Sequence, residues 1–229
     1  MKGKQQFLCQ VPVLADLADE DLTKLADQLV EKGFDHEELI MAEGDVGDFL
    51  IILTEGKVKI TLYSRAGREF VLHTFGAGAV VGEMAILDDE PRSANVIGDG
   101  EGKYLILHRR VFKDFVVRRP EVALKLVKQL SQRLREANEK LSDLALLDVS
   151  SRVARHLLQL ATERGEETDD GVFVADRPTH QDIANLIGTS RETVSRVMSA
   201  LLKKQFIRYD GKGLVIPLEG MDSLEDALD

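Results

Sequence analysis

The sequence predicts an α+β protein in which an N-terminal antiparallel β-roll and a C-terminal helical domain with a β-hairpin are joined by a long helix. From Gly33 to about His108, short β-rich runs alternate with glycines, a pattern typical of an antiparallel barrel or roll. Helical apolar spacing follows, and 229 residues suffice for two modest cores. We expect the roll with its N-terminal helices at 1–110, the long helix and hinge at 111–147, the C-terminal domain at 148–218 and an acidic tail at 219–229.

The composition excludes several classes of protein. Averaged over the whole chain, the net charge of −10 disfavours binding to nucleic acid, which is itself an anion. The segment from Arg191 to Lys212 is an exception, because its cations outnumber its anions six to two. The single cysteine, Cys9, can neither close an internal disulfide nor supply the thiolates of an iron–sulfur cluster. Apolar runs fall short of the roughly 20 residues that span a bilayer, and no signal-peptide region follows Met1. We therefore expect a cytoplasmic protein with no membrane partner.

The N-terminal part is predicted to contain short helices followed by β-strands. Leucines at helical spacing between residues 12 and 31 indicate one or two helices. The β-rich runs predict strands at 49–53, 58–63, 70–75 and 104–107, and we expect the intervening glycines to mark turns.

The long helix, expected over 111–146, carries an apolar seam of the coiled-coil type. Its members follow one another at spacings of 3, 4, 3, 4 and 3, and they are Val127, Leu130, Leu134, Ala137, Leu141 and Leu144. The strict repeat favours a parallel homodimer. The alternative is that the seam packs against the roll of its own chain. Asp148 is the expected N-cap of the next helix, which makes 145–149 a hinge.

The C-terminal part resembles a helix-turn-helix with a wing. Between predicted helices at 179–187 and 190–203, Ala184, Gly188 and Val194 stand at the offsets that this motif requires. Strands at 206–209 and 214–216 form the expected wing hairpin. The polar segment 165–171 is expected to be a solvated loop, whereas 221–229 is left open between a disordered tail and a short amphipathic helix.

The second helix of this pair has the side chains of a DNA reader. Arg191 and Arg196 can bind guanine through two hydrogen bonds, and Glu192 can accept one from cytosine. Nearby hydroxyls and cations are candidate phosphate contacts, namely Thr179, Ser190, Ser195, Lys203 and Lys212. The alternative is that Thr189 and Glu192 form a capping box and that the arginines are ordinary surface cations.

The stretch GEMAILDDEPRSA, from Gly82 to Ala94, places Glu83 and Arg92 nine residues apart between two apolar runs. A carboxylate binds vicinal sugar hydroxyls well, and an arginine binds phosphate through its planar fork. Glycine at the start lets backbone N–H groups approach a ligand. The chemistry suits a ribose phosphate. The alternative is that Glu83 and Arg92 pair with each other in a surface loop.

These motifs together resemble a known family. Gly82-Glu83 followed by Arg92-Ser93-Ala94 resembles the phosphate-binding cassette of cyclic-nucleotide-binding domains, and the glycines in 43–45 and 55–58 are similar to those of their β-roll. Residues 141–160 and 190–194 closely resemble the cyclic-AMP receptor protein and fumarate-nitrate regulator family of bacterial transcription regulators, closest to its cyclic-AMP receptor branch. The resemblance covers about residues 7–217 and implies a cyclic-nucleotide-binding β-roll, a dimerisation helix and a winged helix-turn-helix.

The resemblance also implies roles for single residues. Glu83 would hold the ribose 2′-hydroxyl and Arg92 would neutralise the cyclic phosphate, and other contacts would come from Gly82, Met84, Ser93 and Ala94. The base-reading residues, Arg191, Glu192 and Arg196, would recognise a TGTGA-like half-site. Further DNA contacts are expected from Thr179, Gln181, Ser190, Ser195 and Lys212. A homodimer would present half-sites one DNA turn, roughly 34 Å, apart, and RNA polymerase is an expected partner.

One departure concerns the base of the nucleotide. Where enterobacterial relatives have Thr-Ser, this chain has Ala137-Asn138, so recognition would rest on the Asn138 amide, which can pair with adenine or guanine. Cyclic AMP is the favoured effector, with cyclic GMP or another nucleotide left open, and no metal is expected.

Other functions remain as alternatives. One is a regulator of the same scaffold that senses haem or a gas through His36, His73 or His108. Another is a constitutive DNA-binding dimer with no nucleotide effector. An enzyme is not expected, because the chain shows no nucleophile–base set and no metal-ligand spacing.

Overall fold

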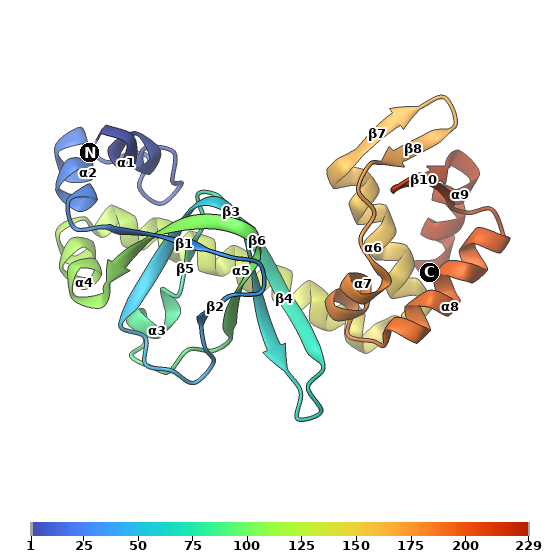
Figure 1. Ribbon diagram of the computed structural model, residues 1–229, viewed down its shortest axis with the longest axis horizontal. Helices are drawn as coiled ribbons and strands as arrows, with labels where there is room; N and C mark the ends of the chain where they lie inside the picture. The colour runs from blue at the N-terminus through green and yellow to red at the C-terminus, as the bar shows by residue number, and fades with distance from the viewer. Residues whose placement is uncertain (1, 229) are drawn as a thin grey trace. The chain divides into compact units, whose positions relative to one another are not determined.

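The computed structural model describes residues 2–228, and the chain forms two compact units, Met1–Arg135 and Glu136–Asp229. The first unit contains the β-roll and the second contains the helix-turn-helix (Figure 1). None of the described helices is both long and apolar enough to cross a membrane.

The first unit is an antiparallel β-roll with helices at its ends. Its strands pair in the order β1-β6-β3-β4, while β2 joins β6 and β5 joins β3. The strands are β1 (Val30–Phe34), β2 (Leu39–Met41), β3 (Phe49–Tyr63), β4 (Glu69–Gly76), β5 (Val80–Val81) and β6 (Asn95–His108). The helices are α1 (Lys2–Leu8), α2 (Asp19–Ala26), α3 (Met84–Leu87), α4 (Arg109–Arg118) and the first part of α5 (Pro120–Leu146). Helices α1, α2 and α4 gather at one end of the roll and bury leucines and Phe112 against it (Figure 1).

The strands predicted at 49–53 and 58–63 are one continuous strand. The β3–β6 register shifts on both sides of Glu55, so the chain passes this point by a bulge and needs no turn. Gly56 has a positive φ of 79°, and a Cβ there would lie 2.5 Å from the Glu101 carbonyl oxygen. The glycine therefore allows two backbones to approach within the sheet, where the sequence pattern had indicated a turn.

The helix predicted over 111–146 is divided into α4 and α5 at Arg119. Pro120 lacks an N–H and occupies the first position of α5, where that donor is not needed. Arg119 donates from Nε to Asp21 Oδ2 at 2.7 Å and from Nη2 to Asp21 Oδ1 at 2.6 Å, which ties the junction to α2. The buried residues of α5 are Val122 and Leu126, both close after this break.

The second unit packs a helical core, built from α6, α7, α8 and α9, against a small antiparallel sheet of order β7-β8-β10-β9. Its helices are α6 (Val149–Arg164), α7 (His180–Ile187), α8 (Arg191–Lys203) and α9 (Leu218–Glu225), followed by a 3₁₀ turn, Asp226–Leu228. Its strands are β7 (Gly165–Thr168), β8 (Gly171–Val174), β9 (Arg208–Asp210) and β10 (Gly213–Pro217). As predicted, Asp148 caps α6 by accepting a hydrogen bond from the Ser151 N–H.

The prediction of a solvated loop at 165–171 is wrong, because this segment forms the β7–β8 hairpin. Thr168 donates from its hydroxyl to the Gly171 carbonyl at 2.9 Å across a tight turn. Gly165 lies so close to Val172 that a Cβ would come within 2.2 Å of it. Cross-strand pairing and these glycines outweigh the polar composition, which matches an edge strand as well as a loop.

The C-terminal segment is the amphipathic helix that the sequence had left open, and the disordered alternative is wrong for 218–228. Helix α9 buries Leu224 completely in the core of the second unit. Gly220 permits close contact, since a Cβ there would lie 2.2 Å from the Phe206 carbonyl oxygen. Asp229, the last residue of the predicted tail, lies outside the described residues.

Candidate functional site

The segment between β5 and β6 forms a tight turn around two charged side chains. Gly82 has a φ of 88°, and a Cβ there would lie 2.7 Å from Arg92 Nη1 and 3.0 Å from the Met41 side chain. Any larger residue would strain the backbone and displace Arg92. The glycine therefore allows the arginine to lie directly against the start of the segment that carries Glu83.

Glu83 is a buried carboxylate, with 2% of its surface exposed. Its Oε1 accepts a 2.6 Å hydrogen bond from Arg133 Nη1, whereas Oε2 is buried without a hydrogen-bond partner among residues 2–228. Burial raises the pKa of Glu83, although the charge of Arg133 opposes the shift. A buried acceptor without a donor is unfavourable, so Oε2 is suited to receive a hydroxyl from a ligand.

Arg92 is 5% exposed and is held by backbone carbonyls. Its Nη1 donates to the Gly82 oxygen at 2.8 Å, its Nη2 donates to the Phe49 oxygen, and its guanidinium lies 5.0 Å from the centre of the Phe49 ring. Burial is the main cause that lowers the pKa of Arg92. The alternative of a Glu83–Arg92 ion pair is wrong, because Glu83 pairs with Arg133 instead.

Arg133 on α5 is a site residue that the sequence analysis missed. Besides Glu83, it binds the Val80 carbonyl oxygen through Nη2 at 2.8 Å, and its guanidinium stacks 4.3 Å from the centre of the Phe75 ring. The only signal in the sequence was its position one helical turn before Ala137, beside the apolar seam. The structure thus brings together a carboxylate and two guanidiniums from three elements.

The remaining predicted nucleotide contacts differ in how exposed they are. Met84 and Ser93 are exposed, whereas Ala94 is buried. Ala137 and Asn138 are exposed on the part of α5 that belongs to the second unit.

A third arginine joins the short helix α3 to α4. Arg109 donates from Nε to the Gly47 oxygen at 2.7 Å, from Nη2 to the Ala85 oxygen at 2.9 Å and from Nη1 to Asp89 at 2.6 Å. Lys113 also donates to Asp89, at 2.5 Å. These contacts join the segment that follows Glu83 to the beginning of α4.

The three histidines considered as haem ligands have other contacts. His36 accepts a hydrogen bond from the Gly100 N–H at 3.2 Å, and the His73 ring lies 4.1 Å from that of Phe75. His108 occupies the N-cap position of α4. Across residues 2–228, no group of three or more His, Cys, Asp or Glu side chains is arranged to hold a metal ion.

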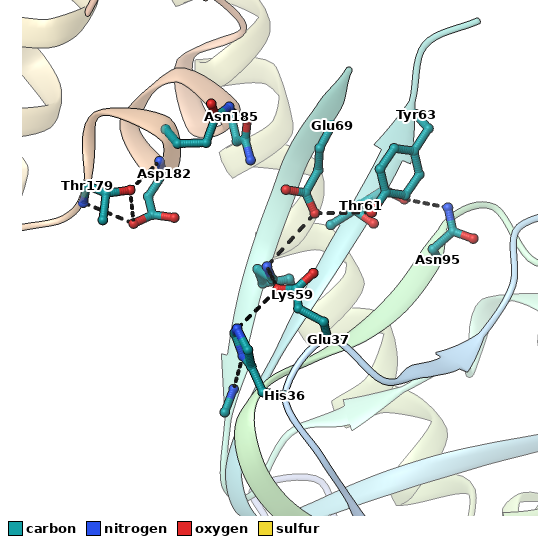
Figure 2. Close-up of polar contacts among 12 residues, drawn as sticks. His36, Glu37, Lys59, Thr61, Tyr63, Glu69, Asn95, Thr179, Asp182 and Asn185 are labelled. Carbon is teal, nitrogen blue, oxygen red and sulfur yellow. Dashed lines mark hydrogen bonds and ion pairs between the residues drawn. The ribbon is translucent and has the colours of Figure 1, made fainter. Parts of the chain in front are cut away.

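The helix-turn-helix in the second unit is formed by α7 and α8. Figure 2 shows the capping box of α7, in which Asp182 accepts from the Thr179 N–H at 3.0 Å while the Thr179 hydroxyl accepts from the Asp182 N–H at 3.1 Å. Gly188 ends α7 in the left-handed conformation, and Ala184 and Val194 are fully buried, as the motif requires.

The capping box considered for Thr189 and Glu192 is wrong. Ser190 is the N-cap of α8 and accepts from the Thr193 N–H at 3.2 Å. The pKa of Glu192 is lowered, mainly by a hydrogen bond to its own backbone and less by the Ser190 hydroxyl and the charge of Arg191. This side chain is therefore an anion at the start of the helix.

The predicted base-reading residues share an exposed surface. Arg191, Glu192 and Arg196 all point out of the core, and Arg196 Nη2 donates to the Thr193 hydroxyl at 3.1 Å. Several of the predicted DNA contacts have side-chain partners within the second unit: Ser195 with His180, Gln181 with Asn185, and Ser190 with Thr193. Lys212 is exposed in the β9–β10 turn.

Comparison with known proteins identifies the family. Residues 31–119 match the cyclic nucleotide-binding domain, and residues 151–226 match the Crp-like helix-turn-helix domain. The CRP-like cAMP-activated global transcriptional regulator of Mycobacterium tuberculosis is 33% identical over 211 residues, which cover 92% of this chain and 94% of that protein. The Cyclic AMP receptor protein of Thermus thermophilus is 34% identical over 215 residues, covering 94% and 93%. This chain belongs to the CRP family.

The solved structures agree with a CRP-family fold. The c-di-GMP responsive global regulator CLP of Xanthomonas campestris superposes with a TM-score of 0.77 at 24% identity, over 87% of this chain and 99% of that one. The family assignment confirms the predicted class of a bacterial transcription regulator with a cyclic-nucleotide-binding domain and a winged helix-turn-helix. The CRP relatives are regulators and not enzymes, as expected.

The seam residues of α5 in this CRP-family chain are largely exposed. Leu134 is 62% exposed and Leu141 64%, and Val127 and Leu144 are exposed as well. Leu130 is half-buried and Ala137 exposed. Within the first unit, the α5 residues buried against the roll are Val122 and Leu126, whereas the seam residues Val127 and Leu134 are exposed, which disfavours packing of the seam against its own roll at these two positions.

Proposed function

We propose that cyclic AMP activates this regulator and that the activated protein binds, as a homodimer, a palindromic DNA site with TGTGA-like half-sites. The observation that carries the proposal is the buried Oε2 of Glu83, which has no hydrogen-bond partner among residues 2–228. Two arginines bind the same segment: Arg133 donates to Glu83 Oε1, and Arg92 donates to the carbonyl oxygen of Gly82. The proposal also includes a cytoplasmic location and RNA polymerase as a partner.

The side chains fit a ribose cyclic phosphate. In the proposal, Glu83 Oε2 accepts a hydrogen bond from the ribose 2′-hydroxyl, and Arg92 exchanges carbonyl partners for the phosphate. An anion is a stronger partner for a guanidinium than a neutral carbonyl, so this exchange is favourable. Asn138 would read the base. The cAMP-activated relative and the Cyclic AMP receptor protein support cyclic AMP over cyclic GMP.

The dimer is supported by the exposed seam on α5. Most of its apolar side chains are exposed, including Val127, Leu134 and Leu141, and such a row is unfavourable in water unless a partner covers it. A parallel pair of α5 helices would place two α8 helices for half-sites about 34 Å apart. Nucleotide binding would then favour the DNA-competent arrangement by its differential affinity for the two states.

One alternative has an observation in its favour. The Glu83–Arg133 pair and the carbonyl contacts of Arg92 partly satisfy these charges without a nucleotide. A constitutive DNA-binding dimer that needs no effector would be compatible with those contacts. Unchanged DNA affinity in an Arg92→Leu variant, with and without nucleotide, would support this alternative.

The decisive experiment is calorimetric titration of the nucleotide-free protein with cyclic AMP, cyclic GMP and cyclic di-GMP, each followed by binding to a TGTGA palindrome. Cyclic AMP is expected to bind most tightly and to raise DNA affinity. Glu83→Ala should weaken nucleotide binding about 10- to 100-fold, because a charged hydrogen bond is lost. Glu55→Ala removes an exposed carboxylate of the same roll and should change nothing. Binding of no nucleotide would refute the proposed effector.

The DNA contacts have their own test. Arg191→Ala or Arg196→Ala should each cost about 1–3 kcal/mol on the matching G·C pair and relax the preference there. Lys212→Ala should weaken specific and random DNA alike, because a phosphate contact carries no sequence information. Fluorescence anisotropy on both DNAs measures this, and equal losses for the arginine variants on the two DNAs would contradict base reading.

A further inference from the structure

His180 connects the recognition helix to the wing. It is the first residue of α7, and its Nδ1 lies 2.8 Å from the Ser195 hydroxyl oxygen on α8. Its other ring nitrogen, Nε2, lies 3.2 Å from the Tyr209 hydroxyl oxygen on β9. One imidazole thus forms hydrogen bonds with hydroxyls from both elements that are proposed to contact DNA.

The segment before α7 holds the same wing a second time. The Arg177 guanidinium stacks 3.9 Å from the centre of the Tyr209 ring. The Arg177 backbone N–H donates to the Lys212 carbonyl oxygen at 3.3 Å, in the wing turn. Tyr209 is therefore contacted on its ring face by Arg177 and at its hydroxyl by His180. The turn that carries Lys212 is hydrogen-bonded to the segment just before α7.

The α8 end of this connection lies among the base-reading residues. Ser195 is one helical turn after Arg191 and directly precedes Arg196. Burial lowers the pKa of His180, and the charges of Arg177 and Arg191 add to the effect. The ring is neutral at pH 7, with one nitrogen donating and the other accepting, and hydroxyls can satisfy both.

We infer that His180 is a positioning residue for DNA recognition, which fixes α8 and the β9–β10 wing relative to each other so that base and phosphate contacts form together. The inference rests on the proposed DNA reader and names a residue of it that the sequence analysis did not assign. In this inference His180 does not bind phosphate itself, because both ring nitrogens already have hydroxyl partners. Fixing two contact surfaces before binding reduces the freedom lost on binding.

The test begins with DNA that is independent of any assumed sequence. The full-length wild type, saturated with the nucleotide it binds or without one if it binds none, selects its site from a randomised duplex pool. A selected site unlike TGTGA would contradict the proposed target and leave the positioning test intact. Affinities of variants are then measured on the selected site and on random DNA at several salt concentrations.

His180→Ala and Tyr209→Phe are each expected to weaken binding to the selected site roughly 3- to 10-fold, the effect of one or two hydrogen bonds. The double variant should bind as His180→Ala does, since both changes break one connection. The salt dependence should stay that of wild type, while Lys212→Ala, the positive control for a phosphate contact, lowers its slope by about 1. His180→Gln, which can reach Tyr209 with its amide, should recover part of the loss.

Three results would overturn the inference. One is additive loss in the double variant, which would show separate roles. Another is a salt slope lowered by about 1 in His180→Ala, which would make the residue a direct phosphate contact. The third is wild-type affinity in both single variants. Thermal melting of each variant separates these outcomes from unfolding, and Tyr209→Phe keeps the ring that Arg177 stacks on.

Discussion

The His156 imidazole lies on α6 with its Nε2 buried and without a hydrogen-bond partner among residues 2–228. Burial lowers its pKa from 6.5 to about 4; Glu163 opposes this shift, and the charges of Arg164 and Lys140 add to it. The imidazole therefore stays neutral in the folded protein at pH values where it is protonated in the unfolded chain. Between pH 6.5 and 4 the unfolded chain binds a proton that the folded chain does not, so stability falls as pH falls through this window.

The second unit should therefore lose stability below pH 6.5. From pH 7.5 to pH 5 this one group should lower the free energy of opening α6 by about 2 kcal/mol. Amide hydrogen exchange of α6 in the full-length protein measures that free energy residue by residue. His156→Gln keeps a polar side chain of similar size but cannot titrate, so its profile should be flatter by the same amount. Parallel pH profiles for the two proteins would show that His156 is not the cause.

Among the strands, the bulge in β3 has a matched control elsewhere in the roll. Gly56 and Gly67 have similar positive φ angles, 79° and 75°. A Cβ at Gly56 would meet Glu101 and Gly102 backbone atoms at 2.5 and 2.9 Å, whereas a Cβ at Gly67 would meet nothing within 4 Å. Gly67→Ala should cost about 1 kcal/mol for its backbone conformation, and Gly56→Ala should cost at least about 1–3 kcal/mol more for overpacking. Urea denaturation of the two variants measures the difference, and equal losses would mean that the close approach relaxes freely.

Most elements follow from local patterns, and the exceptions have physical causes. Apolar spacing and caps predicted α6, α7 and α8, because helix signals lie within one turn of each other. The β7–β8 hairpin was missed because its stability comes from pairing with β10, which no local pattern encodes. The helix break at Pro120 could have been foreseen from the missing N–H, but the apolar seam that follows it dominated the pattern.

The candidate site was predictable only in part, for the same reason. Glu83 and Arg92 lie in one short motif, and their types suggested the chemistry directly. Arg133 comes from a helix 50 residues later in the chain, and only the fold shows that its guanidinium meets Glu83. His180 likewise gains its meaning from Ser195 and Tyr209, which approach it through tertiary packing.

In the proposed homodimer, the two chains would meet at the apolar seam along α5. Leu134 lies 62% exposed, so replacing it leaves the core of its own chain intact. Val117 on α4 is also apolar and is 82% exposed, but it lies outside the seam and serves as the matched control. The seam therefore predicts different outcomes for the same chemical change at these two positions.

Leu134→Asp should convert the dimer into monomers, because a desolvated carboxylate at a coiled-coil core position is strongly unfavourable. Sedimentation equilibrium should show a dimer for wild type and for Val117→Asp, and a monomer for Leu134→Asp with an unchanged circular dichroism spectrum. The monomer should bind a single half-site as wild type does, but it should lose about 10²- to 10⁴-fold on the palindrome, since linked half-sites act at high effective concentration. A dimeric Leu134→Asp protein would place the interface elsewhere, and a monomeric wild type that prefers the palindrome would remove the seam from DNA recognition altogether.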